Sequence, residues 1–157
     1  MPAADLEWLL ISHVESYMRT PALLTAIEAW SEIEKSGHGD GGQLISSDHP
    51  ALIAWDKRDQ TVCGILTYNP KDWESTVKVR IGYVKASHRR YGVYTRLWQH
   101  LVARARKDKC KRIVSVMHAE NAGMRRLATR LGRIQSPLVQ YEQVLDDRPD
   151  FPSASPS

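Results

Sequence analysis

Cysteine and long apolar runs are the scarcest features of this 157-residue sequence, and their scarcity excludes several classes of protein. The two cysteines, Cys63 and Cys110, are too few for a disulfide framework or for a structural zinc site. No apolar run approaches the roughly 18 residues of a membrane span. The first residues also lack the basic and apolar blocks of a signal peptide. We therefore expect a cytoplasmic protein with no metal and no membrane partner.

Length and composition suit one folded domain. In a chain of 157 residues, a hydrophobic share of 42% is enough to build a buried core. Residues 146–157 hold three prolines and three serines, a composition that is typical of disorder. The sequence therefore predicts a single domain over residues 1–145 and a disordered tail over residues 146–157.

Charge is distributed unevenly along the chain, although the net charge is only +4. Residues 1–77 hold 5 Lys or Arg against 12 Asp or Glu, whereas residues 78–133 hold 16 against 2. A basic block of this size favours a polyanionic partner over a solvated surface with no partner. Nucleic acid, a phosphorylated cofactor and an acidic protein are the three candidates for that partner.

Apolar periodicity predicts an α/β fold. Spacings of three and four residues predict helices, and strict alternation predicts strands. Three strands in succession predict an antiparallel meander, and the later strand–helix–strand order predicts a parallel pairing. The predicted helices cover residues 6–17, 21–36, 94–105 and 124–131, and the predicted strands cover residues 51–55, 61–68, 77–83, 111–117 and 138–145.

The segment Tyr83–Tyr94 carries the most informative pattern, because it joins a predicted strand to the first turn of a predicted helix. Backbone N–H groups at a helix start lack partners and attract anions. Gly92 lets a ligand approach the backbone closely, and Arg89 and Arg90 add positive charge. On these grounds the segment is a candidate phosphate site, with an ordinary basic loop as the competing interpretation.

Two motifs resemble those of the GNAT acyltransferase superfamily, whose members use acetyl-CoA. Residues 89–94, Arg-Arg-Tyr-Gly-Val-Tyr, resemble the pyrophosphate loop (Gln/Arg)-x-x-Gly-x-(Gly/Ala). Residues 120–132 resemble the second signature, Asn-x-x-(Ala/Ser)-x-x-Leu-(Tyr)-x-x-x-Gly. The resemblance covers roughly residues 5–145. It implies a mixed, mostly antiparallel sheet with splayed fourth and fifth strands and helices on both faces.

The resemblance also implies where acetyl-CoA binds. The pantetheine arm would lie between the splayed strands and pair with the backbone of Tyr83–Val84. The N–H groups of residues 89–94 would hold the pyrophosphate, and Asn121 would contact the cofactor near its thioester. On charge alone, Arg125 or Arg126 would reach the adenosine 3′-phosphate. The implied cofactor-binding residues are Tyr83, Val84, Arg89, Arg90, Tyr91, Gly92, Val93, Tyr94, Asn121 and Arg125.

The sequence departs from the family pattern at positions that matter for chemistry. Tyr94 stands where the family has a small residue, and Ala128 stands where a tyrosine often protonates the thiolate. Arg133 replaces a common phenylalanine, and Lys78 stands where a glutamate often acts as the base. The predicted elements also lack the family's opening strand. Acid and base must therefore come from other residues, or be absent.

Three residues are candidates for this acid–base chemistry. His118 follows the predicted fifth strand, and the ordinary histidine pKa of about 6.5 suits a general base at neutral pH. Glu74 precedes the fourth strand and would reach the acceptor side. Tyr141, on the last predicted strand, would replace the lost acid. A surface or packing role is the competing interpretation for each.

The resemblance implies an enzyme that moves an acetyl group from acetyl-CoA to an amine by direct attack in a ternary complex. The acidic first half would attract a cationic amine on a small molecule or a protein. Two alternatives stay open. One is a nucleic-acid-associated GNAT-like protein that modifies bases or tRNA or only binds them, and the other is a CoA-binding pseudo-enzyme. Family members often pair, so a homodimer is a further expectation.

Overall fold

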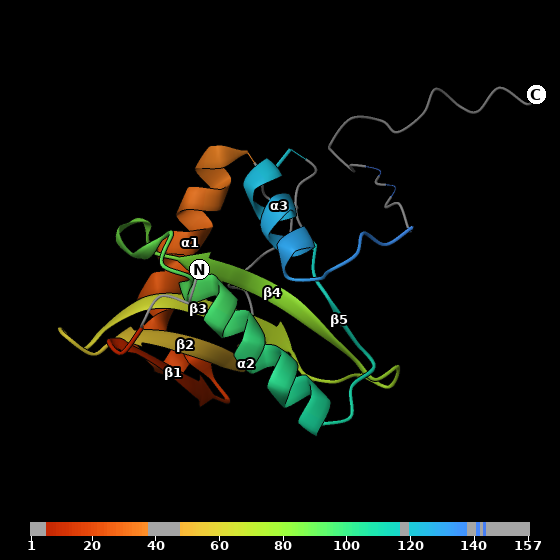
Figure 1. Ribbon diagram of the computed structural model, residues 1–157, viewed down its shortest axis with the longest axis horizontal. Helices are drawn as coiled ribbons and strands as arrows, with labels where there is room; N and C mark the ends of the chain where they lie inside the picture. The colour runs from red at the N-terminus through yellow and green to blue at the C-terminus, as the bar shows by residue number, and fades with distance from the viewer. Residues whose placement is uncertain (1–5, 38–47, 117–119, 138–140, 142, 144–157) are drawn as a thin grey trace, which may run out of the picture.

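The computed structural model describes residues 6–37, 48–116, 120–137, 141 and 143. Its strands form one sheet, with α1 on one side and α2 on the other (Figure 1). The helices are α1 (Ala22–Ser36), α2 (Val93–Lys107) and α3 (Ala122–Arg130), with short 3-10 turns η1 (Tyr17–Arg19) and η2 (Ala86–His88). The strands are β1 (Leu9–Val14), β2 (Ala51–Asp56), β3 (Thr61–Asn69), β4 (Thr76–Val84) and β5 (Arg112–Val114).

The five strands lie side by side in sequence order. Neighbours from β1 to β4 pair antiparallel, and β4 pairs parallel with β5. The antiparallel meander predicted over residues 51–55, 61–68 and 77–83 is therefore confirmed, as is the parallel pairing after α2. The expected fold class, a mixed and mostly antiparallel sheet with helices on both faces, is also confirmed.

The strands β4 and β5 pair along the whole of the short strand β5, and after β5 the chain runs away from β4 (Figure 1). Among the described residues, they pair only where Thr76–Lys78 lies opposite Arg112–Val114. The remainder of β4, Val79–Val84, has no described strand on that side. This open half of β4 is the edge to which an extended ligand can add.

A β-bulge in β4 lies where the divergence begins. The register to β3 passes from Tyr68 opposite Val79 to Thr67 opposite Ile81, so Arg80 is the extra residue. The Ile81 N–H donates instead to the Thr67 hydroxyl at 3.1 Å. A bulge bends and twists its strand, which gives a physical reason for β4 to leave β5 at this point.

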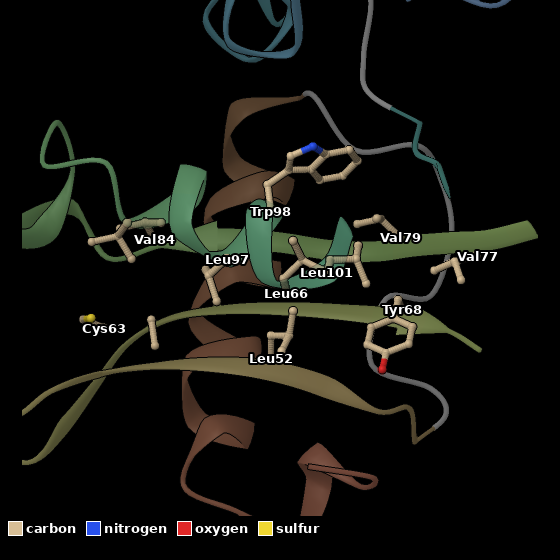
Figure 2. Packing of buried hydrophobic residues seen from close by; sticks show 12 residues of the cluster. Leu52, Cys63, Leu66, Tyr68, Val77, Val79, Val84, Leu97, Trp98 and Leu101 are labelled. Carbon is tan, nitrogen blue, oxygen red and sulfur yellow. The ribbon is translucent and has the colours of Figure 1, made fainter. Parts of the chain in front are cut away.

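Two buried clusters hold the helices to opposite faces of the sheet. On one face, α1 presents small side chains, so the helix lies close to Ile53 and Ile65. On the other face, Leu97 and Leu101 of α2 pack on Leu66 (Figure 2). Buried apolar area, at about 25 cal/mol per Å², is the main force that fixes both layers. The buried residues of α1 are Ala22, Thr25, Ala26 and Ala29, and those of α2 are Val93, Leu97, Trp98, Leu101 and Ala105.

The helices predicted over residues 21–36, 94–105 and 124–131 are confirmed as α1, α2 and α3. Gly37 follows α1 with φ of 71°, and Gly132 follows α3 with φ of 78°. Residues with a Cβ rarely adopt this left-handed conformation, so both glycines act as stop signals. Within the described part of the chain, no helix is long and apolar enough to cross a membrane.

The helix predicted over residues 6–17 is wrong, because Leu9–Val14 form the strand β1. This strand pairs antiparallel with β2 along its whole length, and Trp55 Nε1 donates to the Ser12 hydroxyl at 2.9 Å across the pair. Without β1, β2 would be an exposed edge of the sheet, so strand pairing outweighs the local helical spacing. The opening strand of the family is therefore present.

The end of the chain bears on two further predictions. The predicted strand over residues 138–145 and the predicted tail over residues 146–157 lie outside the described residues, apart from Tyr141 and Gln143. The strand predicted over residues 111–117 is present as β5, which ends at Val114. The structure thus describes the sheet as far as its fifth strand.

Candidate cofactor and active site

The predicted phosphate loop, residues 89–94, follows β4 and η2 and runs into the first turn of α2. Gly92 is the N-cap of α2 with φ of 89°, and Arg90 has φ of 71°. A Cβ built on Gly92 would meet no atom within 4 Å. No side chain caps the helix, and the Arg96 N–H is the donor that bonds back to the Gly92 carbonyl. The N–H groups of residues 93–95 are therefore the ones a helix start offers to an anion.

The electrostatics of this helix start favour a negative ligand. The first turn of α2 contains no acidic residue, so nothing there offsets the positive end of the helix dipole. Arg90 and Arg96, before and within the turn, are both exposed. A phosphate group at Gly92 would meet unpaired N–H donors and positive charge together.

The Arg89 side chain ties the phosphate loop to β4 and α1. Its Nε donates to the Val84 carbonyl at 2.8 Å, and its Nη2 donates to Glu32 Oε1 at 2.7 Å. Its guanidinium also lies over the Tyr83 ring, 5.4 Å from the ring centre. The charge of Arg89 is thus engaged by Glu32, and one β4 carbonyl is already occupied.

The Tyr83 side chain projects from β4 to α1. Its hydroxyl donates to Glu32 Oε2 at 2.7 Å and lies 3.3 Å from Glu28 Oε1. Burial, and then the bond to Glu32, raise the pKa of Tyr83 above its usual value. The same bond lowers the pKa of Glu32. The phenol therefore joins β4 to α1.

Tyr91 and Val93 hold the phosphate loop through their side chains. Tyr91 is 55% exposed and meets the Trp8 ring edge-on, with 6.1 Å between ring centres. Val93 is buried in the cluster beneath α2. The Val93 side chain is thus closed to a ligand, and its N–H group, at the helix start, is the part of this residue that fits one.

Tyr94, the bulky residue of the motif, packs across β4. Its ring lies against Gly82, where a built Cβ would come within 2.7 Å of Tyr94 Cε2. Burial raises the pKa of the Tyr94 hydroxyl, and the nearby Arg133 opposes that rise. The Arg133 guanidinium also stacks on Trp98 at 4.1 Å. The ring covers β4 and leaves the turn at Gly92 open.

Asn121 and Arg125 lie at the start of α3. Asn121 is the N-cap of this helix, and its Oδ1 accepts the Met124 N–H at 3.2 Å. Capping is a structural role that the motif did not reveal, and it uses the acceptor rather than the donors of the side-chain amide. Arg125 is exposed in the same helix.

The structure separates the predicted acid–base residues that it describes from the phosphate loop. Glu74 precedes β4 at the end where β4 and β5 pair, and its exposed carboxylate lies 3.7 Å from Arg112 Nη2. The phosphate loop follows the other end of β4, roughly 26 Å away along the strand. Tyr141 is 93% exposed, and His118 lies outside the described residues.

Three polar residues that the sequence analysis missed lie beside the β4 bulge: Arg80, Tyr17 and His49. The Arg80 Nε and the Tyr17 hydroxyl are buried with no hydrogen-bond partner among the described residues. Burial, and then the Arg80 charge, lower the pKa of His49, so its ring is neutral at pH 7. Burial raises the pKa of Tyr17. Tyr17 fell in the wrongly predicted helix, and the other two belong to no motif, so no sequence signal marked them.

The described part of the chain offers two observations on metal and thiol chemistry. It contains no group of three or more His, Cys, Asp or Glu side chains that could hold a metal ion. Cys63 is buried, and burial raises its pKa to about 11. Its thiol therefore stays protonated at neutral pH and is a poor nucleophile.

The mixed sheet, with β4 open beyond its short parallel pairing with β5 and an uncapped helix start after it, agrees with the fold that the two sequence motifs implied. Residues 22–132 match the acetyltransferase (GNAT) family, and the chain belongs to this family. No curated protein matches the chain in sequence. The recognition that rested on residues 89–94 and 120–132 is thus confirmed at the level of the family.

Similar solved structures include several N-acetyltransferases. An aminoglycoside acetyltransferase from an uncultured soil metagenomic sample, solved with trehalose, has a TM-score of 0.69 at 10% identity, covering 90% of this chain and 100% of that one. The aminoglycoside N-acetyltransferase AAC(6')-Iy with a CoA-containing bisubstrate analogue has a TM-score of 0.57 at 19% identity, covering 87% and 99%. A ribosomal-protein-alanine N-acetyltransferase from Brucella melitensis biovar Abortus 2308 has a TM-score of 0.66 at 15% identity, covering 87% and 99%. At these identities the likeness shows the fold alone.

Proposed function

We propose that this chain transfers an acetyl group from acetyl-CoA to an amine by direct attack in a ternary complex. The observation that carries the proposal is the edge of β4 that no described strand covers beyond its short pairing with β5, together with the uncapped start of α2, where the space at Gly92 is open. Family membership supports it, as do structures of the same fold in complex with CoA or a CoA-containing analogue. We assign the activity to a single domain, residues 1–145, with residues 146–157 as a tail.

The chain's own groups fit acetyl-CoA in three places. The N–H groups of residues 93–95, with exposed arginines beside them, fit the pyrophosphate. The open half of β4, residues 79–84, fits the pantetheine arm, whose amides can pair with a strand edge. Asn121 and Arg125 are the proposed contacts on α3. When bound, acetyl-CoA supplies a thioester whose acyl carbon is open to attack by an amine.

Acetyl transfer requires a neutral amine, so the site must take a proton from an ammonium group. We assign that role to His118. Tyr141 would return a proton to the thiolate, and Glu74 would serve the acceptor side. The neutral ring of His49, beside the β4 bulge, is a second proton acceptor that the structure adds to this set.

The proposed acceptor is an amine on a small molecule or a protein. Enzymes of the same fold are named for acetylation of aminoglycosides and of a ribosomal-protein alanine. The first 77 residues hold 12 acidic against 5 basic side chains, which favours a cationic acceptor over an anionic one.

Thermal shift with CoA is the first test of the proposal. CoA at about 100 times its Kd should stabilise the protein by roughly 2.7 kcal/mol, which raises the Tm of a chain of this size by about 5–10 °C. We also expect acetyl-CoA to release CoA, detected with a thiol reagent, when aminoglycosides or polyamines are added. A thermal shift without release from any amine would indicate the pseudo-enzyme. RNA binding that weakens with salt, and no response to CoA, would indicate the nucleic-acid alternative.

Replacing His118 by alanine should lower kcat far more than the affinity for CoA. Loss of a general base costs about 100-fold or more in rate, and the dependence of kcat on pH between roughly 6 and 9 should flatten because the His118 imidazole is no longer there to titrate. The rate profile and the CoA affinity are measured on the same preparation. A profile identical to that of the parent protein would remove His118 from the mechanism and make His49 the next residue to replace.

A further inference from the structure

We propose that the buried carboxylate of Asp56, acting through His88, positions the phosphate loop for its ligand. The inference rests on the proposed function, because it assumes that this loop binds the pyrophosphate of CoA. It assigns a positioning role to two residues that belong to neither family motif.

Asp56 is the last residue of β2, and its side chain is 3% exposed. Its Oδ1 accepts from the backbone N–H and the Nε of Arg58, each at 3.0 Å, and its Oδ2 accepts from Arg58 Nη2 at 2.7 Å. The Arg58 guanidinium, and with it the His88 ring, hold the pKa of Asp56 well below its usual range against the opposing effect of burial. The carboxylate is therefore ionised and fixed in place at any ordinary pH.

His88 links the fixed carboxylate of Asp56 to the phosphate loop. It is the last residue of η2 and directly precedes Arg89. Its Nε2 lies 2.9 Å from Asp56 Oδ2, and its Nδ1 lies 2.7 Å from the Ser87 hydroxyl. Both ring nitrogens are thus engaged and the side chain is 15% exposed, so the ring has little freedom to rotate.

Trp8 completes the support from the N-terminal side. Its ring centre lies 5.8 Å from that of His88 and 6.1 Å from that of Tyr91. The Arg58 guanidinium covers the same indole at 4.6 Å. One aromatic ring therefore contacts the residue before the loop and a residue inside it, and the Asp56 network holds that ring as well.

The loop has a second anchor, which is weaker. Arg89 pairs with Glu32 on α1, but the two side chains are 42% and 46% exposed. Exposed ion pairs are screened by water and salt, whereas hydrogen bonds to a buried charge keep their strength. The Asp56 anchor should therefore dominate. It is needed because Arg90, with φ of 71°, holds a left-handed conformation that a loose loop would leave.

His88 variants test the proposal on the whole protein, with CoA affinity measured by calorimetry. His88→Ala removes the contact and should weaken CoA binding about tenfold, the effect of losing one hydrogen bond to a charge. His88→Gln retains an amide donor of similar reach and should restore affinity to within about threefold. His100→Ala, which removes an exposed imidazole from α2, is the matched control and should bind CoA as the parent does. Glu32→Gln should cost less than His88→Ala.

The CoA affinity and the Tm of the variants decide whether His88 positions the phosphate loop. Parent-like affinity in His88→Ala, or failure of His88→Gln to restore it, would overturn the positioning role. If His88→Ala lowers the Tm by the same amount without CoA as with CoA, His88 only stabilises the fold. That result would also overturn the positioning role. Absence of CoA binding by the parent protein would refute the proposed function instead, so the two failures are distinguishable.

Discussion

Replacing Gly92 by glutamate should abolish CoA binding while leaving the protein folded. The new carboxylate would lie at the uncapped start of α2 and accept from the N–H groups that fit the pyrophosphate. A Cβ at Gly92 meets no atom, so the cost of the change is the φ of 89°, about 1–2 kcal/mol. Loss of two hydrogen bonds to phosphate, each roughly 1.5–3 kcal/mol, weakens CoA binding by about 100-fold or more.

Gly37→Glu is the matched control for this experiment. Gly37 follows α1 with φ of 71°, and a Cβ built there also meets no atom within 4 Å. Both variants therefore carry similar backbone strain and the same added charge, but only one carries them at the start of α2. Calorimetry with CoA and melting without ligand separate the two effects. Equal CoA affinity in Gly92→Glu and Gly37→Glu would refute the placement of the pyrophosphate at this turn.

Local sequence signals predicted the elements whose determinants lie close together in the chain. Gly37 ends α1 where the periodicity indicated, and the alternation from Val77 to Tyr83 predicted β4. The segment Leu9–Val14 shows the limit of such signals. Its apolar spacing fits a helix, and the partner that makes it a strand is β2, whose Trp55 lies 43 residues from Ser12. Spacing within one segment contains no information about such a partner.

The candidate site shows the same difference between local sequence signals and contacts that only the fold creates. The phosphate loop could be found because its pattern is contiguous and precedes a helix. The side chains that fix it could not, because Glu32 and Asp56 lie 57 and 32 residues from their partners Arg89 and His88. A carboxylate at the end of a strand resembles any turn residue until packing buries it. The buried, ionised state of Asp56 is therefore a property of the fold.

Two departures from the family pattern turn out to be one structural unit. The sequence marked Tyr94 and Arg133 separately, as a large residue in place of a small one and a cation in place of a phenylalanine. In the structure Arg133 contacts the Tyr94 hydroxyl and stacks on Trp98, while the Tyr94 ring occupies the space left by Gly82. The Tyr94 ring of α2 thus fills the space that a side chain at Gly82 of β4 would occupy. This explains how the helix start accommodates a tyrosine.

This unit predicts that Gly82→Ala destabilises the protein although alanine suits a strand better than glycine. Alanine loses less backbone entropy on folding than glycine does, which should stabilise the protein by about 0.5–1 kcal/mol. A Cβ at 2.7 Å from Tyr94 Cε2 must displace the ring, and overpacking of this kind costs roughly 1–3 kcal/mol. At the middle of both ranges the clash outweighs the gain by about 1 kcal/mol, so we expect a Tm lower by about 2–4 °C in a chain of this size.

The same substitution should change sign once the ring is removed. In a Tyr94→Ala background the Cβ of Gly82→Ala meets no phenol, so only the gain of about 0.5–1 kcal/mol is left, and a double-mutant cycle should give a coupling of roughly 1–3 kcal/mol. Gly123→Ala, in α3 with no atom near its built Cβ, is the control and should not destabilise. Additive effects of Gly82→Ala and Tyr94→Ala would mean that the ring does not depend on the glycine. A sign reversal would mean that the protein needs glycine at position 82 to accommodate the Tyr94 ring. The large residue at position 94 of the motif is then compensated by the small residue at position 82.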